Sequence, residues 1–227
     1  MFNFFRRNKQ IKKDDPTRNK LVEKHIEELR KEYPKLPQEA ILKSAKYQAD
    51  WEMDTERLTE EDVLKLIDEL KLPKIVKDLF LENEAVPIGL ENSYRPPTEY
   101  FLMTKKGQDY YQVDTIIPFL CDGGFSKIYA YDTVQRGFLT FDIETPDEIN
   151  QNTRRFVWDG IFVADILRWW ENEIKNEQIL EYGKALDLKW TKEILTSIEE
   201  ELDNSTWENI QQWKEHIYTK YRMITGE

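Results

Sequence analysis

Two carboxylates near the middle of the chain have a spacing that metal-dependent chemistry can use. Asp142 and Glu144 lie two residues apart in the sequence Phe-Asp-Ile-Glu-Thr at 141–145, whose aromatic and β-branched residues favour a strand. Because side chains alternate between the two faces of a strand, both carboxylates are expected on one face. Such a pair can hold two divalent metal ions that activate the attacking and leaving oxygens of a phosphodiester. Nucleic acid hydrolysis is therefore the first chemistry to consider.

The same five residues resemble the first motif of the DEDD family of 3′–5′ exonucleases. The second motif of that family ends in an aromatic residue followed by Asp, whereas Phe156 is followed here by Val157. The third motif places Tyr or His four or five residues before an Asp, and Tyr182 ahead of Asp187 matches it only in part. We therefore favour the alternative that the two carboxylates form the solvent face of a strand.

Other residues that carry chemistry are sparse. His25 and His216 fall on predicted helices near opposite ends of the chain, and nothing in the sequence pairs Cys121 with either of them as a nucleophile. A single cysteine excludes an internal disulfide and a zinc–cysteine cluster. Neither of the usual phosphate-binding glycine motifs occurs. Scattered acids such as Asp114 and Asp132 can supply a glycosidase-type pair, but no spacing selects them. We expect no enzyme activity, cofactor or metal.

The charge of the chain is acidic and uneven. With 33 basic and 44 acidic side chains, the net charge of −11 disfavours binding to nucleic acid and permits attraction to a basic partner. The first thirteen residues instead carry five positive charges and no acid, so the other 214 residues hold 28 basic and 44 acidic side chains, a net charge of −16. Phe2, Phe4 and Phe5 beside these cations are compatible with weak contact at an anionic membrane surface. A frayed basic terminus is the simpler interpretation.

The hydropathy of the chain indicates a cytoplasmic protein. No apolar run approaches the roughly 18 residues that a membrane span requires, and the amino terminus lacks the pattern of a secretory signal. A hydrophobic content of 40% over 227 residues is enough to form a core. We expect a soluble protein without a transmembrane segment.

The elements that would position these residues follow from periodicity. Apolar residues with three- and four-residue spacing predict helices over 16–33, 37–52, 59–72 and 73–82, and again over 159–181, 187–203 and from 205 onward. Between them, segments rich in Tyr, Phe, Ile, Val and Thr predict strands over 86–90, 99–104, 110–120, 127–132 and 137–144. Short turns separate these strands, which favours antiparallel pairing. The fold class expected is α+β, with a central antiparallel sheet flanked by helices.

Three segments between residues 63 and 174 form a recognisable series. The first is Leu72-Pro73, followed by the short helix and by Asn83. The second is the sequence IPFLCDGGF at 117–125, a strand and a turn. The third is the pair of strands after this turn, followed by a helix over 161–170. This series resembles the SUKH superfamily, the fold of fungal cell-wall-synthesis regulators and of many bacterial immunity proteins.

The resemblance implies both an architecture and a function. It implies an α+β core with a sheet of about five strands over 59–178. This sequence adds a basic flexible terminus over 1–14 and helices that the common domain lacks, namely a helical extension over 15–58 and a helical hairpin over 179–227. The resemblance also implies a non-enzymatic protein-binding domain, which in many members of the family neutralises a toxin by binding and occluding it. The alternatives are a regulatory or scaffold protein of the same fold and, third, the DEDD-type exonuclease.

Four residues are the candidates for partner binding. Tyr129 and Tyr131 share one face of the strand at 127–132, while Asp122 and Asp132 lie at the preceding turn and at the end of that strand. Exposed tyrosines beside acids are suited to a basic protein surface. We predict that these four residues bind a basic toxin domain. The alternative is that the tyrosines only cover the core.

Overall fold

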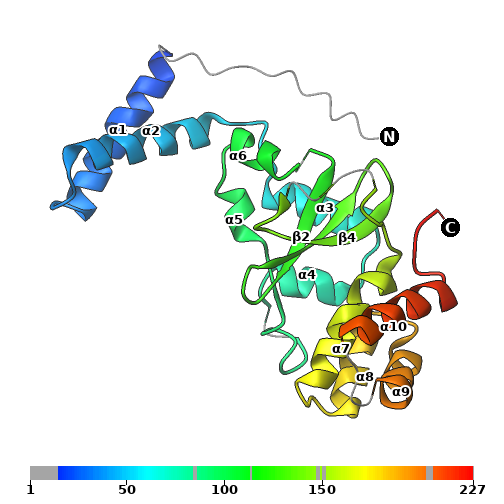
Figure 1. Cartoon of the computed structure of the whole chain (residues 1–227). Helices are drawn as coiled ribbons and strands as arrows, with labels where there is room; N and C mark the ends of the chain where they lie inside the picture. The colour runs from blue at the N-terminus through cyan, green and yellow to red at the C-terminus, as the bar shows by residue number, and fades with distance from the viewer. Residues whose placement is uncertain are drawn as a thin grey trace. The chain divides into compact units, whose positions relative to one another are not determined.

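The computed structural model describes residues 15–83, 86–112, 114–146, 149, 152–202 and 207–226. These residues form two compact units, and each is described by itself: 15–59 with 98–110, and 60–97 with the described residues from 111 onward. The basic terminus predicted over 1–14, including its proposed contact with a membrane surface, lies outside the described residues. Figure 1 shows the chain and labels most of its helices and strands.

The first unit is built on a helical hairpin. Helices α1 (Pro16–Glu32) and α2 (Gln38–Met53) lie side by side and pack through Val22, Ala45 and Ala49, where the small alanine side chains permit close approach (Figure 1). Helix α1 begins where it does because the Asp15 carboxylate accepts a hydrogen bond from the Thr17 N–H at 2.8 Å. The helices predicted over 16–33 and 37–52 are confirmed.

The strand predicted over 99–104 is wrong, because this segment belongs to two short helices of the first unit, α5 (Thr98–Phe101) and α6 (Lys105–Tyr110). Side chains, rather than a neighbouring strand, satisfy its backbone. The fully buried Gln108 donates to the Tyr100 carbonyl at 2.9 Å, and Trp51 donates to the Phe101 carbonyl at 3.1 Å. Carbonyls bound in this way are no longer available to a β-ladder.

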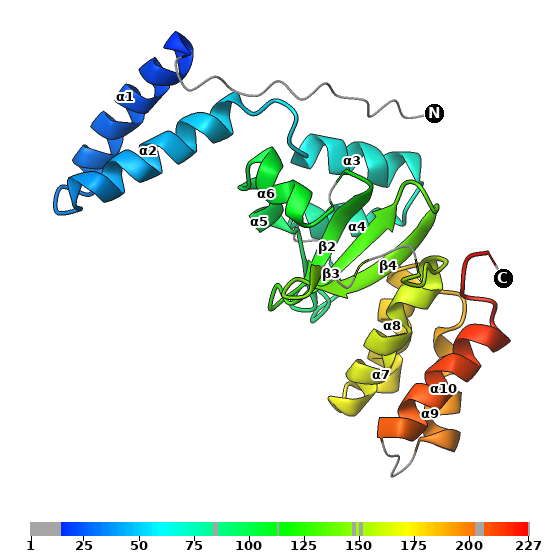
Figure 2. The same ribbon diagram turned by 45° about the horizontal axis from the view of Figure 1, so that its top comes forward.

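The second unit contains an antiparallel sheet of four strands in the order β1-β2-β3-β4. The strands are β1 (Tyr94–Arg95), β2 (Ile116–Asp122), β3 (Lys127–Asp132) and β4 (Gly137–Asp142). The α+β class is confirmed, with four strands in place of about five. Figure 2 shows β2, β3 and β4 side by side.

The edge of the sheet differs from the sequence-based prediction. Residues 86–90 form turns instead of a strand, and the first strand is the short β1, where a turn was expected. Strand β1 ends before Pro96 and Pro97, which lack the N–H groups needed to extend the ladder. Strand β2 begins at Ile116 rather than at residue 110, because helix α6 occupies the residues through Tyr110.

Helices surround this sheet. They are α3 (Glu60–Glu69), α4 (Lys74–Phe80), the 3₁₀ helix η2 (Trp158–Phe162), α7 (Val163–Glu171), α8 (Asn176–Ala185), α9 (Thr191–Glu201) and α10 (Trp207–Lys220). Both ribbon views show α7 to α10 as one group (Figures 1 and 2). Among the residues that the structure describes, no helix is both long and apolar enough to cross a membrane.

The single helix predicted over 159–181 is divided into η2, α7 and α8. Helix α7 ends because Glu173 adopts a left-handed conformation with φ of 59°, and the Ile174 N–H donates to the Trp169 carbonyl at 3.1 Å. This 6→1 hydrogen bond is the Schellman arrangement that terminates helices. The chain can then reverse, so that α7 and α8 pack against each other.

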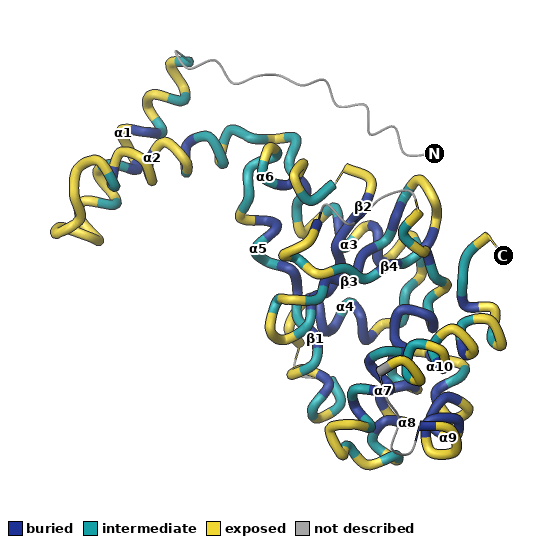
Figure 3. The backbone as a smooth tube through the Cα atoms, in the orientation of Figure 1, coloured by how far each residue is buried: buried dark blue, intermediate teal, exposed yellow. Residues whose placement is uncertain are grey.

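The core of the second unit lies on both faces of the sheet. Figure 3 shows buried positions along β2 and in helix α7. On β3, the Tyr129 side chain lies on one face of the sheet, and those of Ile128 and Ala130 lie on the other. All three are fully buried. A strand that is buried on both faces needs a cover on each, and η2 with α7 covers the Tyr129 face.

Candidate functional site

A buried carboxylate joins the sheet to helix α7. Asp165 is 1% exposed, and its Oδ2 accepts hydrogen bonds from the Tyr129 hydroxyl at 2.7 Å and from the Tyr94 hydroxyl at 3.1 Å. Its Oδ1 lies 3.0 Å from the Lys127 ammonium and 3.2 Å from the Arg168 guanidinium. Four donors therefore satisfy one interior charge, which links β1, β3 and α7.

The two tyrosines of this cluster remain protonated well into the alkaline range. Burial raises the pKa of Tyr94 and of Tyr129 well above the usual value, and the negative charge of Asp165 adds to the effect. The ring of Tyr129 also stacks on Phe162, with 5.8 Å between the ring centroids. Tyr129 therefore acts as a hydrogen-bond donor and a packing residue inside the unit.

Burial of Tyr129 corrects the predicted partner-binding surface. The alternation along β3 does place Tyr129 and Tyr131 on one face, but η2 and α7 cover the Tyr129 end of that face. Tyr131 remains partly exposed and packs on Phe138, with ring centroids 5.1 Å apart. A partner that docks on the folded chain can reach Tyr131 and cannot reach Tyr129.

Asp132 is the second predicted residue that lies in the interior. It is 3% exposed, and its carboxylate forms an ion pair with Arg155 at 2.8 Å. The same carboxylate accepts hydrogen bonds from the N–H groups of Val134 and Gln135, each at 2.8 Å. Asp132 thus stabilises the turn between β3 and β4. Because it is buried there, a docking partner cannot reach it.

Asp122 remains partly exposed and organises the turn between β2 and β3. Its carboxylate accepts hydrogen bonds from the Ser126 N–H at 2.7 Å, the Ser126 hydroxyl at 2.8 Å and the Lys127 N–H at 3.0 Å. Burial alone would raise the pKa of Asp122, but these hydrogen bonds outweigh it and lower that pKa below the usual value. Of the four predicted residues, only Asp122 and Tyr131 keep partial exposure.

The carboxylates of the exonuclease-like segment lie at the end of a strand. Strand β4 ends at Asp142, so Glu144 falls in the following turn, beyond the residues for which strand alternation holds. The Asp142 carboxylate accepts a hydrogen bond from the Glu144 N–H at 2.8 Å, and both side chains are exposed. Asp142 also borders an open pocket of about 480 Å³. In the described part of the chain, no group of three or more His, Cys, Asp or Glu is placed to hold a metal ion.

His25 and Cys121 belong to different units and have separate environments. His25 is buried in the helical hairpin, with ring nitrogens 3.1 Å from Glu28 and 2.9 Å from Glu52. The Cys121 thiol is fully buried in β2 and donates to the Arg95 carbonyl at 3.5 Å.

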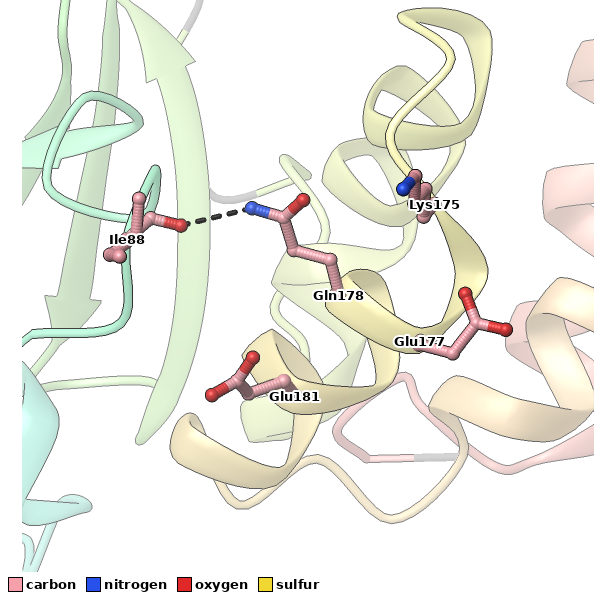
Figure 4. Close-up of a pocket in the computed structure, with 5 residues that line it drawn as sticks. All are labelled: Ile88, Lys175, Glu177, Gln178 and Glu181. Atoms are coloured by element: carbon pink, nitrogen blue, oxygen red, sulfur yellow. Dashed lines mark hydrogen bonds between the residues drawn. The ribbon is translucent and has the colours of Figure 1, made fainter.

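The structure shows an exposed surface that the sequence prediction missed. Ile88 lies on the loop before β1, and this residue is 87% exposed. Its carbonyl oxygen accepts a hydrogen bond from Gln178 of helix α8 at 3.0 Å (Figure 4). It also accepts one from the Tyr182 hydroxyl of the same helix at 2.9 Å. The position of Ile88 between Pro87 and Gly89 could have indicated an exposed turn here, since both flanking residues favour turns over strands.

A pocket of about 350 Å³ lies between this loop and α8, lined by Ile88, Lys175, Glu177, Gln178 and Glu181 (Figure 4). Figure 4 shows Glu177 and Glu181 on either side of Gln178. Burial raises the pKa of Tyr182, and the nearby charges of Glu91 and Glu181 raise it further, against the effect of its hydrogen bond with Gln178. Two carboxylates and one ammonium group therefore line the pocket beside an exposed isoleucine, and the carboxylate of Glu91 binds the N–H of the next residue, Gly89.

The chain matches no protein-family model, no curated protein and no solved structure.

Proposed function

We propose that this chain is a non-enzymatic protein-binding domain of the SUKH type, and that it is an immunity protein which neutralises a toxin by binding and occluding it. The observation that carries the proposal is the strand, turn and strand formed by residues 116–132. The segment that resembles the family motif forms β2 and the following turn, and this turn leads into β3 as the resemblance implies.

The residues of the motif have specific structural tasks, which supports a resemblance beyond chance. Asp122 caps the turn through hydrogen bonds from Ser126 and Lys127. A Cβ atom at Gly123 would lie 2.5 Å from the Asn92 carbonyl oxygen, so the turn requires glycine at this position. Phe119 is fully buried and packs against Trp158, with ring centroids 6.0 Å apart.

The charge of the chain favours a basic partner. Outside the first thirteen residues the net charge is −16, which attracts a positively charged protein over distances comparable to the Debye length. Many toxins that act on nucleic acids must themselves be basic, since they bind phosphates. An acidic protein that covers the basic surface of such a toxin competes directly with its substrate. Inhibition by occlusion needs no catalytic residue in the inhibitor.

Co-expression with the neighbouring genes tests this proposal. The chain is expressed in a sensitive host together with each protein encoded beside its gene. One of these proteins is expected to arrest growth alone, and this chain is expected to restore growth and to form a stable complex with the purified toxin. If no neighbour is toxic, or if the toxin still kills in the presence of this chain, the immunity role is rejected in favour of a regulatory or scaffold role.

A further inference from the structure

We propose that Ile88 and the carboxylates around it form the surface that docks the partner. In this arrangement Ile88 enters an apolar hollow on a basic protein, and Lys and Arg side chains at the rim of that hollow face Glu91, Glu177 and Glu181. The inference rests on the proposed function for the identity of the partner, and it adds the surface used and the chemistry that recognises it.

Ile88 is the most exposed large hydrophobic side chain in the described part of the chain, at 87% against 72% for Val134, the next in the second unit. Single exposed hydrophobic residues are common and need no explanation by themselves. Ile88 differs because a pocket of about 350 Å³ adjoins it and because its backbone is held from two directions.

The loop that carries Ile88 is preorganised. Gln178 and Tyr182 hold the Ile88 carbonyl from helix α8, and the Gly89 N–H donates to the Glu91 carboxylate at 2.7 Å. Gly89 adopts φ of 96°, a conformation that glycine reaches without steric cost. Because the backbone is already ordered, a partner that covers this side chain adds little cost in backbone conformational entropy. These are the conditions under which one residue becomes a binding hot spot.

The charges around Ile88 select the partner. Glu177 and Glu181 line the pocket with Lys175 as the one cation, and Glu91 lies close enough to raise the pKa of Tyr182. A basic rim on the partner complements this surface and accelerates association. A second copy of this chain is a poor occupant, because a two-fold contact would place the same carboxylates opposite one another.

Two variants with matched controls test the surface, with the purified toxin encoded beside this gene as the probe. Ile88→Asp is expected to weaken binding by about 30-fold or more, as for a central hot spot, whereas Val134→Asp leaves affinity unchanged. Glu177→Lys with Glu181→Lys is expected to slow association about tenfold and to flatten its dependence on salt. Glu193→Lys, at an exposed position on α9, is the charge control. All five substituted side chains are exposed, so the changes leave the core intact, and circular dichroism verifies folding.

The outcomes separate this inference from the proposed function. If the toxin binds the unaltered chain and every variant equally well, the surface is wrong while the immunity role stands. If the toxin does not bind the unaltered chain, the immunity role fails, and a photo-cross-linking residue at position 88 is introduced in the native host. Cross-linking there, and not at 134, to a basic protein whose purified form loses binding to Ile88→Asp supports the surface. Cross-links to this chain alone, or equal products at both positions, reject it.

Discussion

The hydroxyl of Tyr129 on β3 lies 2.7 Å from Oδ2 of Asp165 on α7. This hydrogen bond connects two residues that are 36 positions apart in the sequence. Strand alternation alone does not decide whether the face that carries Tyr129 is buried or exposed, and the contact with Asp165 places this tyrosine in the interior. The interior of the sheet is therefore partly polar, with a satisfied carboxylate at the contact with the helix.

Removal of the Tyr129 hydroxyl is expected to lower stability. Tyr129→Phe leaves the ring in place and takes one donor from the buried Asp165 carboxylate, which typically lowers the free energy of unfolding by about 1–3 kcal/mol. Tyr131→Phe, at the partly exposed position on the same face, is the control. It should change the free energy of unfolding by less than about 0.5 kcal/mol. Urea denaturation measures both values. Equal stability of the two variants would contradict the interior role of Tyr129.

The ion pair between Asp132 and Arg155 should be essential for stability. Asp132→Ala leaves Arg155, a residue that is 5% exposed, without its carboxylate partner and removes the acceptor of the Val134 and Gln135 N–H groups. Loss of one partner of a buried pair lowers the free energy of unfolding by about 3–5 kcal/mol. Glu144→Ala, an exposed acid, should have little effect. A mild effect of Asp132→Ala in thermal and urea denaturation would argue that Asp132 is accessible after all.

Alkaline pH should unfold the protein through its buried tyrosines. Because burial raises the pKa of Tyr94 and Tyr129 above the unfolded value of about 10, the folded state retains protons that the unfolded chain releases. The contribution of these two tyrosines to the free energy of unfolding is fully present below a pH of about 10, and it is lost as the pH rises through their pKa values in the folded state. Burial also raises the pKa of Tyr218, to about 12.

Ultraviolet absorbance of tyrosinate during a pH titration measures this effect. Several tyrosines are expected to ionise together with unfolding, at a pH well above the usual tyrosine pKa of about 10. In the Tyr129→Phe variant the cooperative step should involve one tyrosine fewer. Independent ionisation of all tyrosines near pH 10, with the fold intact, would show that the buried cluster is open to solvent.

Metal-dependent nuclease activity is not expected. Asp142 caps the turn that contains Glu144, and both side chains are exposed. The purified chain should leave single-stranded DNA and RNA intact in the presence of Mg²⁺ or Mn²⁺ over hours. Degradation that Asp142→Ala and Glu144→Ala each abolish, while both variants stay folded, would restore the exonuclease hypothesis.

The contact between Gly89 and Tyr182 gives a test of the Ile88 loop that is independent of any partner. Gly89→Ala places a Cβ atom against the Tyr182 hydroxyl at φ of 96°, and should lower the free energy of unfolding by about 2 kcal/mol. Gly226→Ala is the control for the backbone conformation alone, because φ there is 87° and no atom lies within 4 Å. Addition of Tyr182→Phe should restore part of the loss, which a double-mutant cycle measures. Additive effects would mean that the loop and α8 do not touch as described.

Elements that depend on local signals could be predicted from the amino-acid sequence. Helices α1 and α2 follow from apolar periodicity, and the Asp15-Pro16 pair marks the beginning of α1. Strands β3 and β4 follow from their β-branched and aromatic content and from the turn that joins them. Each of these signals involves residues within a few positions of one another, so the sequence contains them in full.

Tertiary structure decided the rest, because the deciding partners are distant in the sequence. Residues 99–104 have strand-like composition, yet Gln108 and Trp51 bind the carbonyls of Tyr100 and Phe101 that a ladder would need. The alternation of side chains along the strands likewise did not predict which residues are exposed to solvent. Asp165 binds the hydroxyl of Tyr129 in the interior. Gln178 and Tyr182, which are 90 and 94 positions from Ile88 in the sequence, bind the Ile88 carbonyl and leave its side chain in solvent. A periodic pattern shows which side chains share a face, and only the packing of remote elements decides whether that face is covered.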